Sequence, residues 1–238
     1  MNGMRTLVRR SVASTRLARD LEGARLIRSV RRQRLTFLDT SALHDLRDRM
    51  REVERKSVPG TVIEAGCALG GSAIVLGSSK SQHRPMTVHD VFGQIPPPGQ
   101  RDGADVHARY EEIASGRATG FDGDQYYGYM GDLKERVTSS FTRFGVQPSN
   151  HNITLIAGLF EETVRPTGAV ALAHIDGDWY DSVSVCLSRI WPKLSEGGVM
   201  VIDDYNDWSG CRTAVDEFLA ATPNVRVEHR SRLHLMRA

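Results

Sequence analysis

The amino-acid sequence predicts an α/β fold with a mostly parallel sheet. Short apolar runs alternate with longer segments of helical periodicity, which is the pattern of strands joined by crossover helices. Runs such as 170–175 and 199–202 are apolar at nearly every position, as expected for parallel strands that are buried on both faces. Near the end, 225–229 and 233–236 alternate apolar and polar residues, which predicts a closing antiparallel hairpin. We therefore expect one domain with a seven-stranded sheet.

The first helix of this domain is predicted over residues 42–56. Leu43, Leu46, Met50 and Val53 recur there at helical spacing, so one face of the helix is apolar. The further elements are expected in this order: strand 61–65, a tight loop 66–71, a helix to about 79, strand 86–90, helix 128–144, strand 153–157, strand 170–175, helix 180–194, strand 199–202, helix 210–221, and strands 225–229 and 233–236.

The stretch 92–127 has no clear period and is predicted to be irregular. It contains Ile95-Pro-Pro-Pro-Gly99 and several Gly–Asp turns. A loop of this length inside a compact domain is usually either a functional lid or disordered. Because the stretch is rich in aromatic and charged residues, we predict a lid insertion at about 92–127.

Basic residues are concentrated at the beginning of the chain. The whole sequence carries a formal net charge of +2, but residues 1–35 hold ten Arg against only Asp20 and Glu22. The segment is therefore +8 and the remainder −6. We predict a basic helical arm over 1–35 and the main domain over 36–238. Such an arm fits either a solvated helix that packs on the domain or on a second subunit, or a peripheral contact with an anionic membrane.

Cysteine usage and hydropathy bear on the compartment. Cys67, Cys186 and Cys211 are odd in number and widely spaced, which favours a reducing compartment over a disulfide framework or a cysteine zinc site. No apolar run approaches the roughly 20 residues of a membrane span, and the beginning of the chain lacks the apolar block of a secretory signal. We therefore expect a cytoplasmic protein.

A glycine-rich loop follows the first predicted strand and opens a helix. Glycines there let the backbone approach a ligand, and the start of a helix offers free N–H groups. Ala68 stands where a dinucleotide fingerprint needs its second Gly, and no P-loop Gly-Lys pair is present. Asp90 ends the next strand, where an acid can accept both hydroxyls of a ribose. The loop and Asp90 together predict a nucleoside-type cofactor, with candidate ligands Glu64, Gly66, Cys67, Gly70, Gly71, Ser72 and Asp90.

Four aspartates follow two later strands. Asp176 and Asp178 come after 170–175, and Asp203 and Asp204 come after 199–202. Because ligands of open α/β sheets bind beyond the carboxyl ends of the strands, we expect these side chains to meet at one edge. Crowded carboxylates repel unless a proton or cation intervenes, and a hard divalent ion with oxygen ligands resolves the repulsion most simply.

Residues 36–238 resemble class I S-adenosylmethionine-dependent methyltransferases, and the second half is similar to the macrocin O-methyltransferase family. The segments that carry the second resemblance are His174-Ile-Asp-Gly-Asp-Trp-Tyr-Asp-Ser182, Cys186-Leu187, Gly197-Gly198, Val201-Ile-Asp-Asp-Tyr205 and Trp208-Ser-Gly-Cys-Arg212. The resemblance implies a Rossmann-like domain that methylates a hydroxyl of a sugar or another polyhydroxylated small molecule. After the second-strand acid, the family usually has a Ser–Phe–Gly-like segment where this chain reads Val91-Phe-Gly93 and continues into prolines.

The resemblance also implies site roles. It assigns a magnesium ion to Asp176, Asp203 and Asp204, and a general base to Asp178. Glu64, Gly66, Ser72 and Asp90 fall on the family's cofactor positions. Gly158 and Phe160 are expected to line the adenine pocket, and Asp176 is expected to contribute to the cofactor site as well.

Two other activities remain open from the residues alone. A catechol-type acceptor would use the same metal chemistry as a sugar. Asp176-Gly-Asp178 is also an Asp-x-Asp pattern, which glycosyltransferases use to hold a metal and a nucleotide sugar, although the glycine loop and Asp90 already supply a nucleoside site. We expect a homo-oligomer that binds no nucleic acid, because no RNA-binding module with interleaved aromatics is present.

Overall fold

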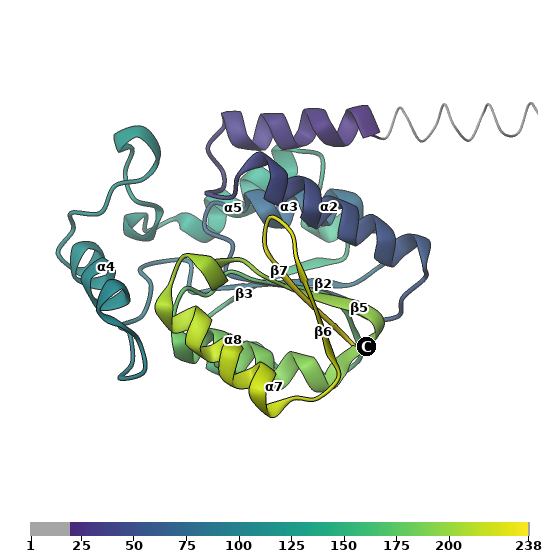
Figure 1. Ribbon diagram of the computed structural model, residues 1–238. Helices are drawn as coiled ribbons and strands as arrows, with labels where there is room; N and C mark the ends of the chain where they lie inside the picture. The colour runs from purple at the N-terminus through teal and green to yellow at the C-terminus, as the bar shows by residue number, and fades with distance from the viewer. Residues whose placement is uncertain (1–19, 238) are drawn as a thin grey trace, which may run out of the picture.

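Seven strands form one sheet in the computed structural model, which describes residues 20–237. In chain order they are β1 (Thr61–Ala65), β2 (Met86–Asp90), β3 (Ile153–Ala157), β4 (Val170–Ile175), β5 (Leu194–Ile202), β6 (Val225–His229) and β7 (Leu233–Arg237). Their order across the sheet is β3-β2-β1-β4-β5-β7-β6 (Figure 1). Strands β1 to β5 pair in parallel, whereas β7 runs antiparallel to β5 and β6. The predicted fold class is confirmed.

Helices cover both faces of this sheet. They are α2 (Thr40–Arg55), α3 (Gly71–Ser79), α4 (Ala104–Ala114), α5 (Leu133–Arg143), α6 (Phe160–Thr163), α7 (Tyr180–Ile190) and α8 (Ser209–Ala221). In Figure 1, α2, α3 and α5 lie on one face, and α7 and α8 lie on the other. None of the helices within residues 20–237 combines the length and the apolar character needed to cross a membrane.

The core lies in two layers on either side of the sheet. Strand β4 is buried at every position. After a register irregularity between Val170 and Leu172, its side chains alternate between the layers, as the two-residue period of a strand requires. Leu172 joins the cluster under α2, α3 and α5, whereas Ala173 and Ile175 join the cluster under α7 and α8. The continuous apolar run in the sequence therefore reflects burial on both faces.

Helix α2 shows how the sequence sets a local boundary. The Asp39 side chain accepts a hydrogen bond from the Ala42 N–H at 2.8 Å, so it caps the start of the helix. Leu43, Leu46 and Met50, which carry the predicted apolar stripe, are all fully buried. The helix predicted over 42–56 is confirmed, with its ends one or two residues earlier.

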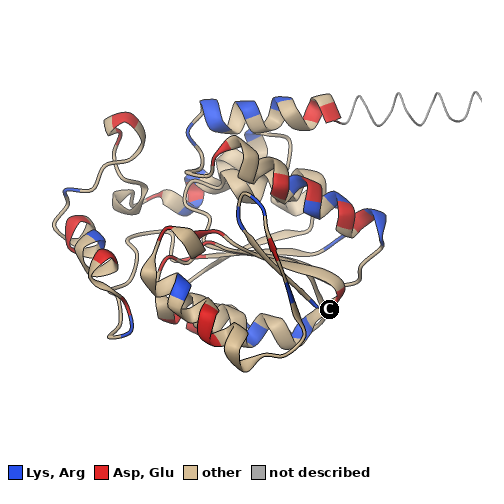
Figure 2. Cartoon of the chain, in the orientation of Figure 1, with Lys and Arg blue, Asp and Glu red and all other residues tan. Residues whose placement is uncertain are grey.

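The basic arm is described only from residue 20 onward. Residues 20–32 form a helix that lies outside α2 and α3 in Figure 1, and the ribbon colours of Figure 2 mark its basic and acidic positions. Ile27 and Val30 are buried against the body, whereas Arg25 and Arg28 are exposed. The helix is therefore packed on the domain, and the prediction for residues 1–19 lies outside the described residues.

The prediction that 92–127 is irregular was wrong, because this stretch contains α4. Val106 and Ile113 are seven residues apart, so they share one face, and they are the helix's buried residues. Ile113 packs in a small cluster with Ala118 and Tyr126 rather than on the main core. The apolar stripe of α4 is narrow, and it follows a segment rich in Pro and Gly. The sequence pattern therefore did not indicate a helix there.

Three boundaries also differ from the prediction. Strand β5 begins at Leu194, which pairs with Val170 before the Gly197-Gly198 irregularity, and not at 199. Helix α7 ends at Ile190, because Pro192 follows in a short 3-10 turn. Helix α5 begins at 133 rather than 128, after another 3-10 turn at Tyr127–Tyr129.

Candidate functional site

The carboxyl ends of β1, β4 and β5 lie side by side because these strands are neighbours in the sheet. This arrangement brings the glycine loop after β1 next to Asp176 and Asp178 after β4, and to Asp203 and Asp204 after β5. The backbone continues the sheet pairing for one residue, with Asp176 N–H donating to Ala65 O and Asp203 N–H donating to Ile175 O. The sequence-predicted edge is therefore the location of the candidate site.

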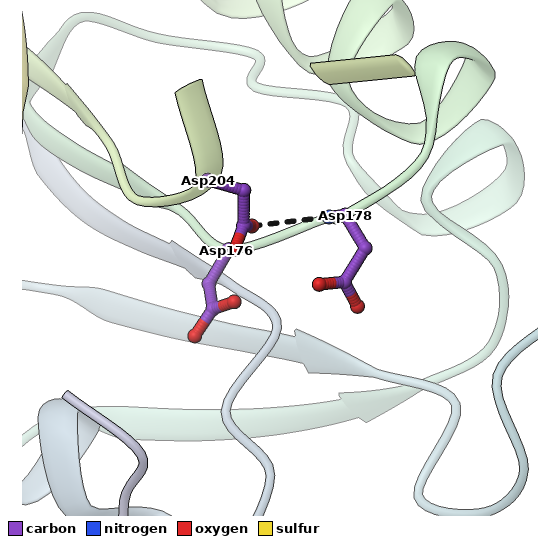
Figure 3. Close-up of side chains that lie close together, drawn as sticks. All are labelled: Asp176, Asp178 and Asp204. Carbon is purple, nitrogen blue, oxygen red and sulfur yellow. Dashed lines mark hydrogen bonds between the residues drawn. The ribbon is translucent and has the colours of Figure 1, made fainter. Parts of the chain in front are cut away.

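Three carboxylates form the acidic cluster of Figure 3: Asp176, Asp178 and Asp204. One oxygen from each lies within 4.8 Å of the others; Asp204 is buried, and the other two are half-buried. The Asp178 N–H donates to Asp204 Oδ2 at 3.1 Å (Figure 3). Asp178 also has a positive φ of 53°, which is uncommon for a residue with a side chain. The backbone turn thus holds Asp178 against Asp204.

Burial and the neighbouring carboxylates disfavour the ionised forms of all three aspartates in the acidic cluster. Burial, and then the neighbouring Asp204 carboxylate, raise the pKa of Asp176 well above its usual value. Burial, and then Asp203, raise the pKa of Asp178 to about 7. Burial, and then Asp178, raise the pKa of Asp204. Three hard oxygen donors that resist ionisation together match a divalent cation such as Mg²⁺, whose charge would stabilise their ionised forms.

Asp203 has different partners from the acidic cluster. Its Oδ1 accepts a hydrogen bond from Arg232 Nε at 2.5 Å and lies 3.7 Å from His174 Nε2. Burial alone would raise the pKa of Asp203, but His174 and Arg232 outweigh burial and lower it. The role of Asp203 as a metal ligand stays a prediction, because its side chain is occupied by two basic groups in this structure.

His174 links Asp203 to the strand that precedes the glycine loop. The ring is fully buried, and its Nδ1 lies 3.1 Å from Glu64 Oε2. Burial would lower the pKa of His174, but the carboxylates of Glu64 and Asp203 raise it well above its usual value. Glu64 Oε1 accepts from the Ser72 hydroxyl. Both Glu64 oxygens therefore have protein partners.

The glycine loop is held close to the acidic cluster. Gly66 has a φ of +89°, and a Cβ there would lie 1.9 Å from the Asp176 carbonyl oxygen, so only glycine fits. Asp90 Oδ2 accepts from the Cys67 N–H at 2.8 Å and the Ala68 N–H at 3.2 Å. Burial raises the pKa of Asp90, against these hydrogen bonds. The acid at the end of β2 thus shapes the loop.

A cavity opens beside these groups, with about 580 Å³ of space that includes its opening to solvent. The glycine loop, the end of β2, the lid, the segment after β3 and the segment after β4 all contribute to its wall. The lining residues are Gly66, Cys67, Ala68, Asp90, Val91, Gly93, Ile95, Pro96, Tyr127, Leu159, Phe160, Glu161, Asp176, Gly177, Asp178 and Ser182.

The predicted site residues divide into two groups. Gly66, Cys67, Asp90, Phe160, Asp176 and Asp178 line the cavity. Others lie behind its wall. Glu64 and Ser72 bond to each other, Gly70 starts α3 with a φ of +91°, and the Gly71 N–H donates to Leu35 O. Gly158 donates its N–H to Asp90 O at 3.0 Å. Direct cofactor contact by this second group stays a prediction.

The sequence reasoning did not identify the lid residues of the cavity. Ile95, Pro96 and Tyr127 line it, and the Trp179 indole donates to Pro96 O at 2.9 Å. The Tyr180 N–H donates to Asp102 Oδ1 at 2.8 Å. The aromatic and proline content of 92–127 was the only sequence signal for these residues. It predicts a lid but does not indicate which of its side chains line the cavity.

Known proteins are similar to this chain over most of its length. Residues 19–226 match the family model described as Macrocin-O-methyltransferase (TylF). The chain is 30% identical, over 77% of its length and 67% of the relative, to the 8-demethyl-8-(2,3-dimethoxy-alpha-L-rhamnosyl)-tetracenomycin-C 4'-O-methyltransferase of Streptomyces olivaceus. It is 27% identical, over 78% of its length and 68% of the relative, to the demethyldecarbamoylnovobiocin O-methyltransferase of Streptomyces niveus.

Solved structures share the fold. The O-methyltransferase NovP superposes with a TM-score of 0.71 at 23% identity, covering 86% of this chain and 82% of that chain. The calicheamicin methyltransferase CalS11 superposes with a TM-score of 0.54 at 21% identity, covering 81% and 78%.

Proposed function

Because the chain belongs to the macrocin O-methyltransferase family, we propose that it transfers a methyl group from S-adenosylmethionine to a hydroxyl of a sugar carried by a small-molecule glycoside. The enzyme is an O-methyltransferase; the cofactor, the sugar acceptor and a requirement for Mg²⁺ are the proposal. One observation carries it. The acidic cluster and the glycine loop open into the same cavity, so a cofactor and a hydroxyl acceptor would meet beside Asp178.

The names of relatives support a sugar acceptor. The Streptomyces olivaceus relative is named for a rhamnosyl-bearing tetracenomycin, and a Micromonospora griseorubida relative is named for mycinamicin III. Both names describe O-methylation of a natural product. We infer the same acceptor class here from these names, because the proposed metal ligands and base would serve a sugar hydroxyl and a catechol hydroxyl alike.

The cavity residues suit S-adenosylmethionine. Asp90 lines the cavity and would accept hydrogen bonds from ribose hydroxyls, as an acid at the end of the second strand does in nucleoside sites. It would use the lone pairs that remain beside those engaged by backbone N–H groups. The Gly66 and Cys67 backbone would approach the amino-acid portion, and Phe160 offers an apolar face to the adenine. These roles are inferred from residue chemistry and cavity position.

Asp176 and Asp204 are the proposed carboxylate ligands of Mg²⁺, with Asp203 as a further predicted ligand. When bound, the ion supplies Lewis acidity that lowers the pKa of a coordinated hydroxyl and orients it. The carboxylates fit this role because their oxygen donors lie within 4.8 Å of one another, and burial and neighbouring carboxylates raise the pKa of both Asp176 and Asp204.

Asp178 is the proposed general base. One of its carboxylate oxygens would accept the proton that the acceptor hydroxyl releases during methyl transfer. Arg109 and Trp208 act against the effect of burial and lower the pKa of Asp178, so they help to keep it ionised. The pKa of Asp178 is about 7 without a cation, and a bound Mg²⁺ would lower it and increase the ionised fraction near neutral pH.

Two tryptophans beside the lid, Trp179 and Trp208, would help to orient the acceptor and to exclude water. Trp179 is buried and lies edge-on to Trp208, with ring centroids 5.9 Å apart. Its indole N–H is satisfied by Pro96 O on the lid. The indole pair therefore joins the lid to the loop that carries Asp178, and its apolar surface keeps water away from the base.

The proposal is tested by product analysis. The enzyme is incubated with Mg²⁺, deuterated-methyl cofactor, and a panel of deoxysugar glycosides, their aglycones and a catechol. We expect a mass gain of one labelled methyl on a glycoside and none on its aglycone, and tandem mass spectrometry should locate the label on the sugar. Labelling of the catechol or aglycone with no labelled glycoside would overturn the acceptor class.

A further inference from the structure

Residues 34–37 form a short strap between the N-terminal helix and α2. The strap is fixed against the glycine loop, because the Gly71 N–H donates to Leu35 O at 2.8 Å. A Cβ at Gly71 would lie 2.6 Å from that oxygen and 2.7 Å from Thr36 Cβ. Thr36 is buried. The backbone of the strap and the start of α3 are therefore in close contact.

The other side of the strap holds the tip of the lid, which we define as residues 119–125. The Arg34 guanidinium contacts Asp122 Oδ2 and Asp124 Oδ2, each at 2.8 Å. The Phe37 ring stacks on the Phe121 ring, with centroids 4.2 Å apart and planes inclined by 19°. Phe37 is 47% exposed, so its main apolar contact is with the lid.

The backbone at this contact adopts an unusual conformation. The N-terminal helix ends with the Arg34 N–H donating to Arg31 O and the Leu35 N–H donating to Val30 O, and Arg34 has a φ of 57°. Glycine is the usual residue at such a helix end, because a Cβ is disfavoured there. An arginine at this position is explained by its side chain, which reaches both aspartates of the lid tip.

Two tyrosines connect both the lid tip and the strap to the cavity. Tyr126 and Tyr127 directly follow the tip in the chain. From the strap, the Phe37 ring centroid lies 6.1 Å from that of Tyr127, which lines the cavity. Tyr127 packs on Tyr126 at 4.5 Å, and Arg109 of α4 lies over the Tyr126 ring at 5.6 Å. A displacement of the tip would therefore move an aromatic wall of the cavity together with α4.

We propose that Arg34 and Phe37 are positioning residues that hold the lid closed over the cavity, using the glycine loop as their support. The proposal rests on the proposed function only in taking the cavity as the place where cofactor and acceptor meet. The strap contacts the glycine loop on one side and the lid tip on the other. A fixed position of the glycine loop therefore limits the movement of the lid tip. Neither side chain lines the cavity. Phe37 therefore acts through Tyr127 and Phe121, and Arg34 acts through the two aspartates of the lid tip.

The first test needs no acceptor. Trypsin cleavage after the exposed Arg117 is followed by mass spectrometry as the appearance of the fragment that begins at Ala118, for the full chain and for Phe37→Ala and Arg34→Glu. We expect at least about tenfold faster cleavage in both variants, equivalent to weakening the closed lid by about 1.4 kcal/mol. Arg28→Glu, which changes an exposed charge on the same helix, is the matched control and should cleave at the original rate.

A charge exchange separates positioning from general destabilisation. Arg34→Glu combined with Asp122→Arg and Asp124→Arg restores the opposite charges across the contact. Because the new arginines are themselves trypsin sites, these variants are compared by hydrogen exchange of the 119–125 backbone amides, where the triple variant should recover the slow exchange that Arg34→Glu loses. Unchanged cleavage in Phe37→Ala and Arg34→Glu, or equal acceleration in Arg28→Glu, would overturn the proposal. Failure of the triple variant to recover would overturn the role of Arg34.

Kinetics provide the second readout, using whichever labelled acceptor the panel yields. We expect Phe37→Ala to raise the acceptor KM about tenfold, with the affinity for S-adenosylhomocysteine changed less than twofold. A fall in kcat and in thermal stability without a change in KM would assign Phe37 a structural role only. The cleavage assay stands even if the sugar acceptor is wrong, so the two proposals can fail separately.

Discussion

The backbone N–H of Asp178 donates to Asp204 Oδ2 at 3.1 Å and thereby joins the loop after β4 to the turn after β5. The contact places a proposed base and a proposed metal ligand in one acidic cluster. It also uses an oxygen of Asp204 to fix the position of the Asp178 backbone, while the Asp178 carboxylate remains in the cavity wall.

Asp178→Asn should lower kcat by about 10²-fold or more, the usual scale for loss of a general base. The amide keeps the size of the side chain but cannot accept the proton. Binding of S-adenosylhomocysteine, measured by calorimetry, should be unchanged. Asp181→Asn, an exposed neighbour at the start of α7, is the matched control and should keep full turnover. A similar kcat for Asp178→Asn and the unchanged enzyme would remove Asp178 from this role.

Removal of magnesium should abolish activity, and excess Mg²⁺ should restore it. Asp204→Asn and Asp176→Asn should each weaken Mg²⁺ binding by about tenfold or more, because each removes a charged oxygen donor from a hard-cation site. Calorimetric titration with MgCl₂ measures this directly, and Asp207→Asn at an exposed neighbouring position is the control. Full turnover in excess chelator would contradict the metal requirement.

The metal-free protein should lose stability as the pH rises through about 7. In the folded protein, burial and Asp203 raise the pKa of Asp178 from 3.8 to about 7. A group whose pKa is higher in the folded state than in the unfolded state stabilises the folded protein. This stabilisation is complete below the pKa of the unfolded state and is lost as the pH rises through the pKa of the folded state. The Tm should decrease as the pH is raised from about 5.5 to about 8, and the decrease in Tm with pH should be smaller in Asp178→Asn.

Mg²⁺ should reverse that loss because it favours the ionised carboxylates. The increase in Tm on adding MgCl₂ should therefore be larger at about pH 8 than at about pH 5.5. Asp181→Asn should show the same pH dependence as the unchanged protein. A Tm increment that shrinks with rising pH would show that the cation does not act on these carboxylates.

Gly66→Ala should destabilise the protein and weaken cofactor binding. The added Cβ would collide with the Asp176 carbonyl at 1.9 Å, so the loop and the strand end must move apart, at a typical overpacking cost of about 1–3 kcal/mol. Gly145→Ala is the control, since it has a φ of +74° but no atom within 4 Å of the new Cβ. Urea unfolding should rank Gly66→Ala as clearly more damaging than Gly145→Ala.

Much of the fold could be predicted because burial leaves a periodic pattern in the sequence. Strands β1 to β4 agree with their predicted ranges, since each is a short apolar run bounded by polar residues. Helix α4 was missed because it packs on a small lid cluster and not on the main core. The start of β5 was missed because Gly197 and Gly198 interrupt the strand pattern, whereas pairing with β4 extends beyond them.

The sequence by itself determined the α/β class, the glycine loop, and the presence of four aspartates at strand ends. It could do so because strand burial and turn chemistry are local properties. Only the tertiary structure decided which groups each aspartate contacts. Asp176, Asp178 and Asp204 form the acidic cluster. Asp203 instead contacts His174 and Arg232. Side-chain direction depends on neighbours far away in the chain, and Arg232 comes from the turn between β6 and β7.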